Sequence, residues 1–223
     1  MIKTDPWQEE LPFAPFRCAW IIFLIYFGPT IFTFCKFSVG ISTVFTMFLA
    51  LLACIGTPEQ LGIKRVKGKD FLLAVGVYCL VISCAAISEP FWKIFLDSHN
   101  IEYAQQQEIA DTLGSSSIID KVLLWVSTCV FTPVVEEVLF RRIIYGWFAS
   151  KNRYVAFFVT SAIFSLMHFF ILGIPSLFFM GLGFQFVYLL HKNLWTAIIL
   201  HSLVNTIACI AMSLKFSFEQ LFG

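Results

Sequence analysis

Charged side chains are scarce in this sequence. Asp, Glu, Lys and Arg make up 13% of its 223 residues, whereas hydrophobic residues make up 59%. This balance excludes an ordinary soluble domain, because a chain of this size cannot bury so much apolar surface in its own core. The mean hydropathy of +0.83 is typical of a chain whose apolar excess faces lipid. With a net charge of only +1, the chain has no basic footprint, so no nucleic-acid partner is expected.

Cysteine pairs and internal repeats are also missing. No CxxC motif is present, which argues against the disulfide frameworks of small secreted domains. The cysteines all lie in apolar runs and are interpreted as small core residues: Cys18, Cys35, Cys54, Cys79, Cys84, Cys129 and Cys209. The first sixteen residues contain acidic side chains and no small-residue cleavage site, so the first apolar run is expected to be a retained span.

Long apolar segments fill most of the chain. A spanning helix needs about 20 apolar residues, and seven segments meet this length approximately. They lie near residues 17–35, 40–56, 71–88, 120–147, 154–171, 175–191 and 195–213. The sequence therefore predicts an all-α, polytopic transmembrane helical bundle with about seven spans, and a long loop over residues 88–118.

Basic residues are distributed unevenly between the predicted loops. If the spans alternate, eleven of the 15 Lys and Arg residues fall on one side and four on the other. Cytoplasmic loops carry the excess of Lys and Arg. The N-terminus is therefore expected in the cytoplasm and the C-terminus on the opposite side, in an integral protein of a bacterial-type plasma membrane.

Two carboxylates and an arginine interrupt the fourth apolar segment. A charge at bilayer depth costs about 2.5–3.5 kcal/mol on insertion scales, so these residues are expected only where they have a structural or catalytic role. Glu137 and Arg141 are four residues apart and are expected to pair on one helix face. Glu136 is rotated about 100° from Glu137 and is left available for general-base chemistry. Pro133 removes a helical hydrogen bond and is expected to bend the helix, making room for water.

Histidines and amides mark the later segments. Phe164 lies one turn before His168, which predicts a packed and oriented imidazole. His201 and Asn205 are also one turn apart, so both side chains project from one helix face and could donate hydrogen bonds to an oxyanion. Gln185 is interpreted as an interhelical amide or as a residue that supports the site residues. Taken singly, a structural ion pair or an interhelical hydrogen bond explains each residue as well; together they predict a shared polar cavity.

Three motifs in this order resemble the CPBP (Abi) family of intramembrane proteases. The motifs are Glu-Glu-x-x-x-Arg from Glu136, Phe-x-x-x-His ending at His168, and His-x-x-x-Asn from His201. That family includes type-II CAAX prenyl endopeptidases and bacteriocin-processing and immunity proteins. The resemblance covers about residues 118–213, which would form the catalytic core, whereas residues 1–117 match only as membrane spans and loops.

The resemblance implies a role for each motif residue. Glu136 would activate the attacking water with help from His168, and His201 with Asn205 would stabilise the oxyanion. Glu137 and Arg141 would support the helix and tune the site.

The metal requirement stays open at this point. Two imidazoles and a carboxylate, from Glu136, His168 and His201, could bind zinc. A glutamate with a histidine could also activate water without a metal.

The expected function is therefore hydrolysis of a peptide bond in a membrane-associated protein or peptide substrate, either prenylated or bearing a leader, with membrane lipid as the other partner. The alternatives are a non-catalytic immunity or scaffold protein and, as a third choice, a small proton-coupled transporter, because intramembrane glutamates and histidines also mark proton paths.

Overall fold

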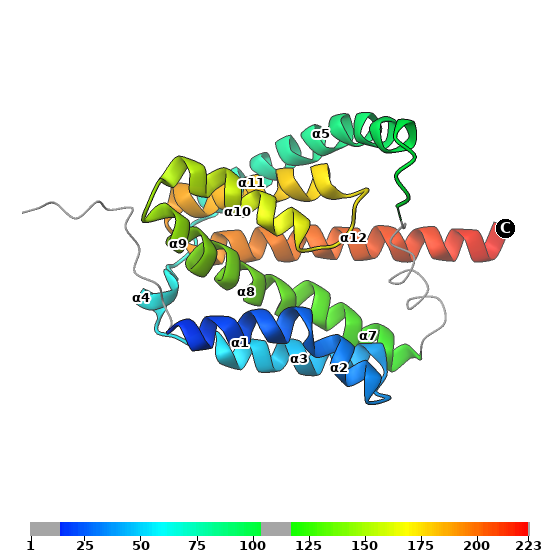
Figure 1. Ribbon diagram of the computed structural model, residues 1–223, viewed down its shortest axis with the longest axis horizontal. Helices are drawn as coiled ribbons and strands as arrows, with labels where there is room; N and C mark the ends of the chain where they lie inside the picture. The colour runs from blue at the N-terminus through cyan, green and yellow to red at the C-terminus, as the bar shows by residue number, and fades with distance from the viewer. Residues whose placement is uncertain (1–13, 104–116, 223) are drawn as a thin grey trace, which may run out of the picture. The chain divides into compact units, whose positions relative to one another are not determined.

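The computed structural model describes residues 14–103 and 117–222, with the side chains of these residues up to residue 214. Every regular element in this part of the chain is a helix, as the ribbon shows (Figure 1). The all-α prediction is therefore confirmed for the described residues.

Four helices are long and apolar enough to cross a membrane. They are Gly68–Ser98 (α5), the continuous run Ile118–Ala149, Ile174–His191 (α11) and Leu194–Leu214 within α12 (Leu194–Phe222). The helices α1 (Pro15–Tyr26) and α2 (Gly28–Phe34) pass the same test together but are bent by 51°. The apolar helices α3 (Val39–Ala53) and α10 (Arg153–Leu166) are shorter. The described residues thus contain four candidate spans, or five with the bent pair, and the number of seven spans stays a prediction.

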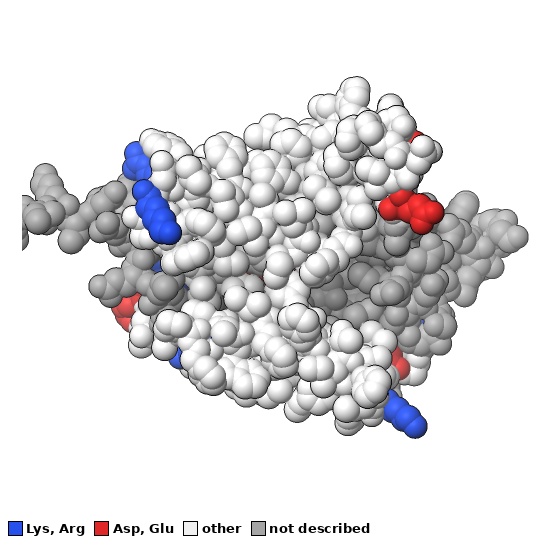
Figure 2. Space-filling view, viewed as in Figure 1, with Lys and Arg blue, Asp and Glu red and all other residues white. Residues whose placement is uncertain are grey.

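The surface has the composition of one that faces lipid. Large apolar side chains are exposed along many helices; for example, Phe34 is 89% exposed and Leu72 is 72% exposed. Figure 2 shows that most of the visible face carries no Lys, Arg, Asp or Glu. In water such a surface would be an aggregation hazard, whereas in a bilayer it is the expected outer layer.

The described residues divide into two compact units that do not follow the order of the chain. One, the Glu136 unit, holds residues 14–56, 117–139 and those from His201 onwards. The other, the Arg141 unit, holds residues 57–103 and 140–200. The predicted catalytic core at 118–213 contributes to both units, and its separate role stays a prediction.

In the Glu136 unit, α3 packs against α1, α2 and α7 (Ile118–Val126). The Ser38 side chain caps α3 by accepting a hydrogen bond from the Ile41 amide, and its hydroxyl donates to the Asp120 carboxylate at the start of α7. A Cβ on Gly40 would lie 2.9 Å from the Asp120 carbonyl oxygen, so only glycine permits this close approach. These contacts hold α3 beside the helix that continues toward Glu136.

In the Arg141 unit, α11 packs against α5 and α10, and α10 packs against α9 (Tyr145–Ala149). Arg142 donates through Nε to the carbonyl of Gln60, in the short α4 (Pro58–Leu61), at 3.0 Å. Its Nη1 donates to the Tyr188 hydroxyl on α11 at 3.1 Å. Arg142 therefore links the short helix α4 to α11, one of the candidate membrane spans.

The predicted loop over residues 88–118 begins later than expected. Helix α5 continues through Pro90 to Ser98. The prediction of a loop from Ser88 is wrong because the apolar sequence continues beyond the proline, and Leu96 is only 1% exposed. The Trp92 indole also anchors this part of α5 by donating to the Ile171 carbonyl at 2.8 Å. The rest of the predicted loop, residues 104–116, lies outside the described residues.

Candidate functional site

The two predicted catalytic glutamates lie in an irregular stretch of helix. Helix α7 passes into a π-helical turn, η1 (Ser127–Phe131), then into α8 (Thr132–Glu137), and a second π-helical segment, η2 (Val138–Ile144), follows. Glu136 and Glu137 are the last two residues of α8 and are both buried. π-Helical turns are rare and occur often at functional sites.

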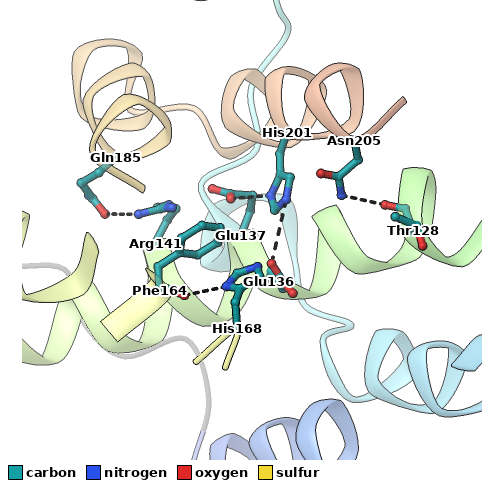
Figure 3. A network of polar contacts seen from close by, with 9 residues as sticks. All are labelled: Thr128, Glu136, Glu137, Arg141, Phe164, His168, Gln185, His201 and Asn205. Carbon is teal, nitrogen blue, oxygen red and sulfur yellow. Dashed lines mark hydrogen bonds and ion pairs between the residues drawn. The ribbon is translucent and has the colours of Figure 1, made fainter. Parts of the chain in front are cut away.

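Glu137 is hydrogen-bonded to the histidine of the last motif. The Nδ1 of His201, on α12, lies 2.9 Å from Oε1 of Glu137 (Figure 3). Glu137 is 0% exposed and His201 is 3% exposed. Because a carboxylate in this pair can only accept, Nδ1 carries the hydrogen. Nε2 is the ring nitrogen that can contact a water molecule or a substrate. Glu137 therefore fixes the orientation of His201 and keeps a hydrogen on its Nδ1.

Glu136 faces the other nitrogen of the same imidazole. Its Oε2 lies 3.9 Å from His201 Nε2, which is too long for a direct hydrogen bond. This oxygen is buried and has no hydrogen-bond partner among the described residues. A polar separation beyond about 3.5 Å is one that a water molecule or a substrate oxygen can bridge. Glu136 and His201 thus present an acceptor and a ring nitrogen to the same small space.

Asn205 binds the backbone of the π-helical turn. Its side-chain amide donates to the Thr128 carbonyl at 2.8 Å (Figure 3). One turn of α12 separates Asn205 from His201, so both side chains face the same neighbouring helix. The predicted oxyanion role of Asn205 stays a prediction, and the amide already has a backbone partner.

Arg141 is enclosed by the Arg141 unit. It is 0% exposed, and its Nη1 donates to Gln185 Oε1 on α11 at 3.0 Å. Its guanidinium carbon lies 5.5 Å from the ring centre of Phe164 and 5.9 Å from that of Phe184. Stacking on two aromatic rings offsets part of the desolvation cost of a buried cation. The predicted interhelical role of Gln185 is confirmed by its bond to Arg141.

His168 lies just beyond the end of α10 and is held by the residue one turn before it. Its Nδ1 lies 2.7 Å from the Phe164 carbonyl oxygen, and the two rings are 4.7 Å apart at their centres. A carbonyl can only accept, so Nδ1 carries the hydrogen and Nε2 is the acceptor. The predicted packing of an aromatic ring beneath His168 is confirmed.

The six predicted site residues divide between the two units. The Glu136 unit brings together the two glutamates and His201, with Asn205 one turn further along α12. The Arg141 unit holds Arg141 and His168, which share Phe164 as a partner. Convergence of all six residues on one cavity stays a prediction, as does the pairing of Glu137 with Arg141.

The donor groups do not fit a zinc site within either unit. No group of three or more His, Cys, Asp or Glu side chains in the described part of the chain is arranged to hold a metal ion. In the Glu136 unit, His201 Nδ1 is already bonded to Glu137, which leaves one imidazole nitrogen and the Glu136 carboxylate. Structural and catalytic zinc sites use at least three protein ligands. We therefore assign no catalytic step to a metal.

Sequence reasoning missed the Glu137–His201 bond and the role of the Thr128 carbonyl. Both contacts join residues more than 60 positions apart in the chain, and motif spacing reports only neighbours on one helix. The signal that could have pointed to the second contact is Pro133, because a proline inside a continuous helical run leaves one carbonyl without its helical donor.

The segment that carries this site is similar to a family of membrane proteases. Residues 118–207 match the family described as Type II CAAX prenyl endopeptidase Rce1-like. The match includes all three motifs, so the resemblance inferred from them is confirmed over this segment. With the spanning helices, it identifies the chain as an integral membrane protein with a protease-like segment.

Two bacterial relatives show the same similarity. The chain is 30% identical over 106 residues to YdiL of Bacillus subtilis, a protein named as a membrane peptidase; these residues cover 47% of this chain and 43% of the relative. It is 34% identical over 111 residues to the membrane-embedded CAAX protease MroQ of Staphylococcus aureus, covering 46% of this chain and 45% of the relative. The alignments thus span under half the length of each relative. No solved structure matches the chain significantly.

Proposed function

We propose that this protein is an intramembrane endopeptidase that hydrolyses a peptide bond with a water molecule activated by Glu136. The observation that carries the proposal is the arrangement around one imidazole. Glu137 fixes the ring from one side at 2.9 Å, and the buried, unbonded Oε2 of Glu136 faces the other side at 3.9 Å. A buried carboxylate oxygen without a hydrogen bond is costly to maintain and is expected where a ligand completes the site.

In the proposed reaction, water is the nucleophile and Glu136 is the base. The water oxygen attacks the scissile carbonyl carbon as Glu136 takes a proton from the water. The carbonyl oxygen becomes an oxyanion. When the tetrahedral intermediate collapses, the C–N bond breaks and Glu136 returns the proton to the leaving nitrogen. This reaction is balanced in atoms and protons, and it needs no covalent bond between the enzyme and the substrate.

His201 has a complementary role in the same scheme. A carboxylate on one ring nitrogen holds an imidazole in place, as Glu137 does at Nδ1 here. In the proposed scheme both ring nitrogens of His201 carry a hydrogen throughout the reaction, so Nε2 donates a hydrogen bond to the oxyanion. Preorganised donors of this kind contribute about 3–4 kcal/mol to transition-state stabilisation.

The substrate is proposed to be a membrane-associated protein or peptide. Support comes from the similarity to a CAAX protease and from the apolar surface of the chain, which is typical of a protein surrounded by lipid. A prenylated C-terminus and a leader-bearing precursor are the two substrate forms to compare. Both would reach the site from the membrane.

The test is cleavage by the purified protein in liposomes. Peptides of one sequence, with and without a prenyl group, are incubated with the wild-type protein and with Glu136→Ala, and products are identified by mass spectrometry. We expect the wild-type protein to release two fragments whose masses sum to that of the substrate plus one water. The Glu136→Ala variant should release none while remaining in the membrane. Equal cleavage by both proteins would exclude Glu136 as the base.

The same assay addresses zinc. Cleavage is measured after treatment with a chelator, and the metal content of the protein is determined in parallel. His201 and Glu136 offer only two ligands in the Glu136 unit, whereas a zinc site needs at least three, so we expect cleavage to persist. Loss of cleavage that added zinc restores would instead support the zinc ligands predicted from the sequence, Glu136, His168 and His201.

A further inference from the structure

The π-helical turn before the glutamates leaves one backbone carbonyl without a donor. The amide of Thr132 donates to the Ser127 carbonyl, five residues back, which is the π-helical pattern. In the same pattern, the next amide would be that of residue 133 and its acceptor would be the Thr128 carbonyl. Residue 133 is proline, which has no N–H. The Thr128 carbonyl therefore lacks its helical partner.

Asn205 supplies the missing donor. Its side-chain nitrogen lies 2.8 Å from the Thr128 oxygen, and because a carbonyl can only accept, the amide must present its N–H₂ group there. Both residues are half-buried, and Ser127, the first residue of the turn, and Pro133, two residues after it, are buried. A carbonyl at membrane depth without a hydrogen bond costs free energy, and water does not readily replace the lost partner.

We propose that Asn205 is a positioning residue that takes the place of the absent Pro133 amide and so fixes the register of α8. This inference rests on the proposed function, because α8 carries Glu136 and Glu137. A shift of one residue in this helix would rotate both carboxylates by about 100°. His201, one turn from Asn205 on α12, would then lose the carboxylate that orients it. Asn205 thus acts on the reaction through the backbone, in contrast to the oxyanion contact predicted from the sequence.

A double-mutant cycle tests the proposal without requiring activity. Asn205→Ala removes the donor, and Pro133→Ala restores a backbone amide that can replace it. In the wild-type background, we expect Asn205→Ala to lower the unfolding temperature of the purified protein by about 3–10 °C. In the Pro133→Ala background, the loss should be less than half as large. Equal losses in both backgrounds would overturn the proposal.

A matched control uses another polar residue on α12. The Thr206 hydroxyl donates to the Ser202 carbonyl of its own helix at 2.7 Å and makes no bond to η1. The effect of Thr206→Ala should therefore be the same in both backgrounds. If Pro133→Ala prevents folding, Asn205→Leu replaces the amide by an apolar group of similar size that cannot donate. It should lower the unfolding temperature as much as Asn205→Ala, and wild-type stability of Asn205→Leu would overturn the proposal.

Cleavage rates separate positioning from a direct oxyanion contact. We expect Asn205→Ala to lower kcat at least tenfold in the wild-type background. The double variant should cleave within about threefold of Pro133→Ala alone, because the restored amide holds α8. An oxyanion donor cannot be replaced by a backbone amide of α8, so an undiminished loss in the double variant would contradict the proposed action through Thr128. If no variant or wild type cleaves any peptide, the proposed function fails, whereas the thermal cycle still decides the role of Asn205.

Discussion

Replacement of Glu137 tests the most enclosed contact of the candidate site. Glu137→Ala removes the acceptor 2.9 Å from His201 Nδ1 and leaves a buried N–H without this partner. An unsatisfied buried donor costs about 1–3 kcal/mol, and breaking a buried charged pair costs about 3–5 kcal/mol. We therefore expect a loss of about 3 kcal/mol. In a protein of this size, each kcal/mol lowers the unfolding temperature by about 2–4 °C, so the expected shift is about 6–12 °C.

The assay is thermal unfolding of the detergent-solubilised protein, followed by intrinsic fluorescence. Glu137→Gln keeps the shape and one accepting oxygen but removes the charge, so it should lose only about 1 kcal/mol. Glu59→Ala is the control, because Glu59 is exposed on α4 and its replacement should change stability by less than about 0.5 kcal/mol. An unfolding temperature of Glu137→Ala within about 1 °C of wild type would refute the reasoning.

Three further predictions concern the rest of the structure. Arg141→Lys should cost about 1–3 kcal/mol in thermal unfolding, because lysine cannot reproduce both the planar bond to Gln185 and the stacking on two rings; a variant as stable as wild type would show that charge alone is enough. Asn193→Ala should lower stability by a similar amount, because its buried side chain bonds both the amide and the carbonyl of Lys64, at 2.9 and 3.1 Å; unchanged protection of this segment from hydrogen exchange would contradict it. A reporter fused after Gly223 should be active only outside the cytoplasm if seven spans are present, and a cytoplasmic signal would exclude that number.

The positions of the helices could largely be predicted from the sequence, because hydropathy is a local property. Each of the seven predicted apolar segments overlaps a helical part of the structure, although the fifth, 154–171, extends beyond the end of α10 at Leu166. The end of α5 was expected at residue 88, yet the helix continues past Pro90 for eight residues to Ser98. A single lost hydrogen bond is tolerated when the following apolar side chains still pack, as Leu96 does.

The internal geometry of the site could be predicted only in part. Spacing along one helix correctly related Phe164 to His168, since both belong to the same turn. The bond between Glu137 and His201 joins residues 64 positions apart and depends on how two helices pack. The π-helical turn before Pro133 could not be predicted from the sequence either. Its register depends on Asn205, which lies far away in the sequence, as well as on the local residues.

The most direct measurement is the single-turnover cleavage rate of purified Glu136→Gln, compared with wild type and with the exposed control Glu59→Gln. General-base catalysis contributes about 10²–10⁴-fold, so Glu136→Gln should be at least about 100-fold slower while Glu59→Gln cleaves at the wild-type rate. Cleavage by Glu136→Gln within tenfold of wild type would contradict the claim that this carboxylate activates the water.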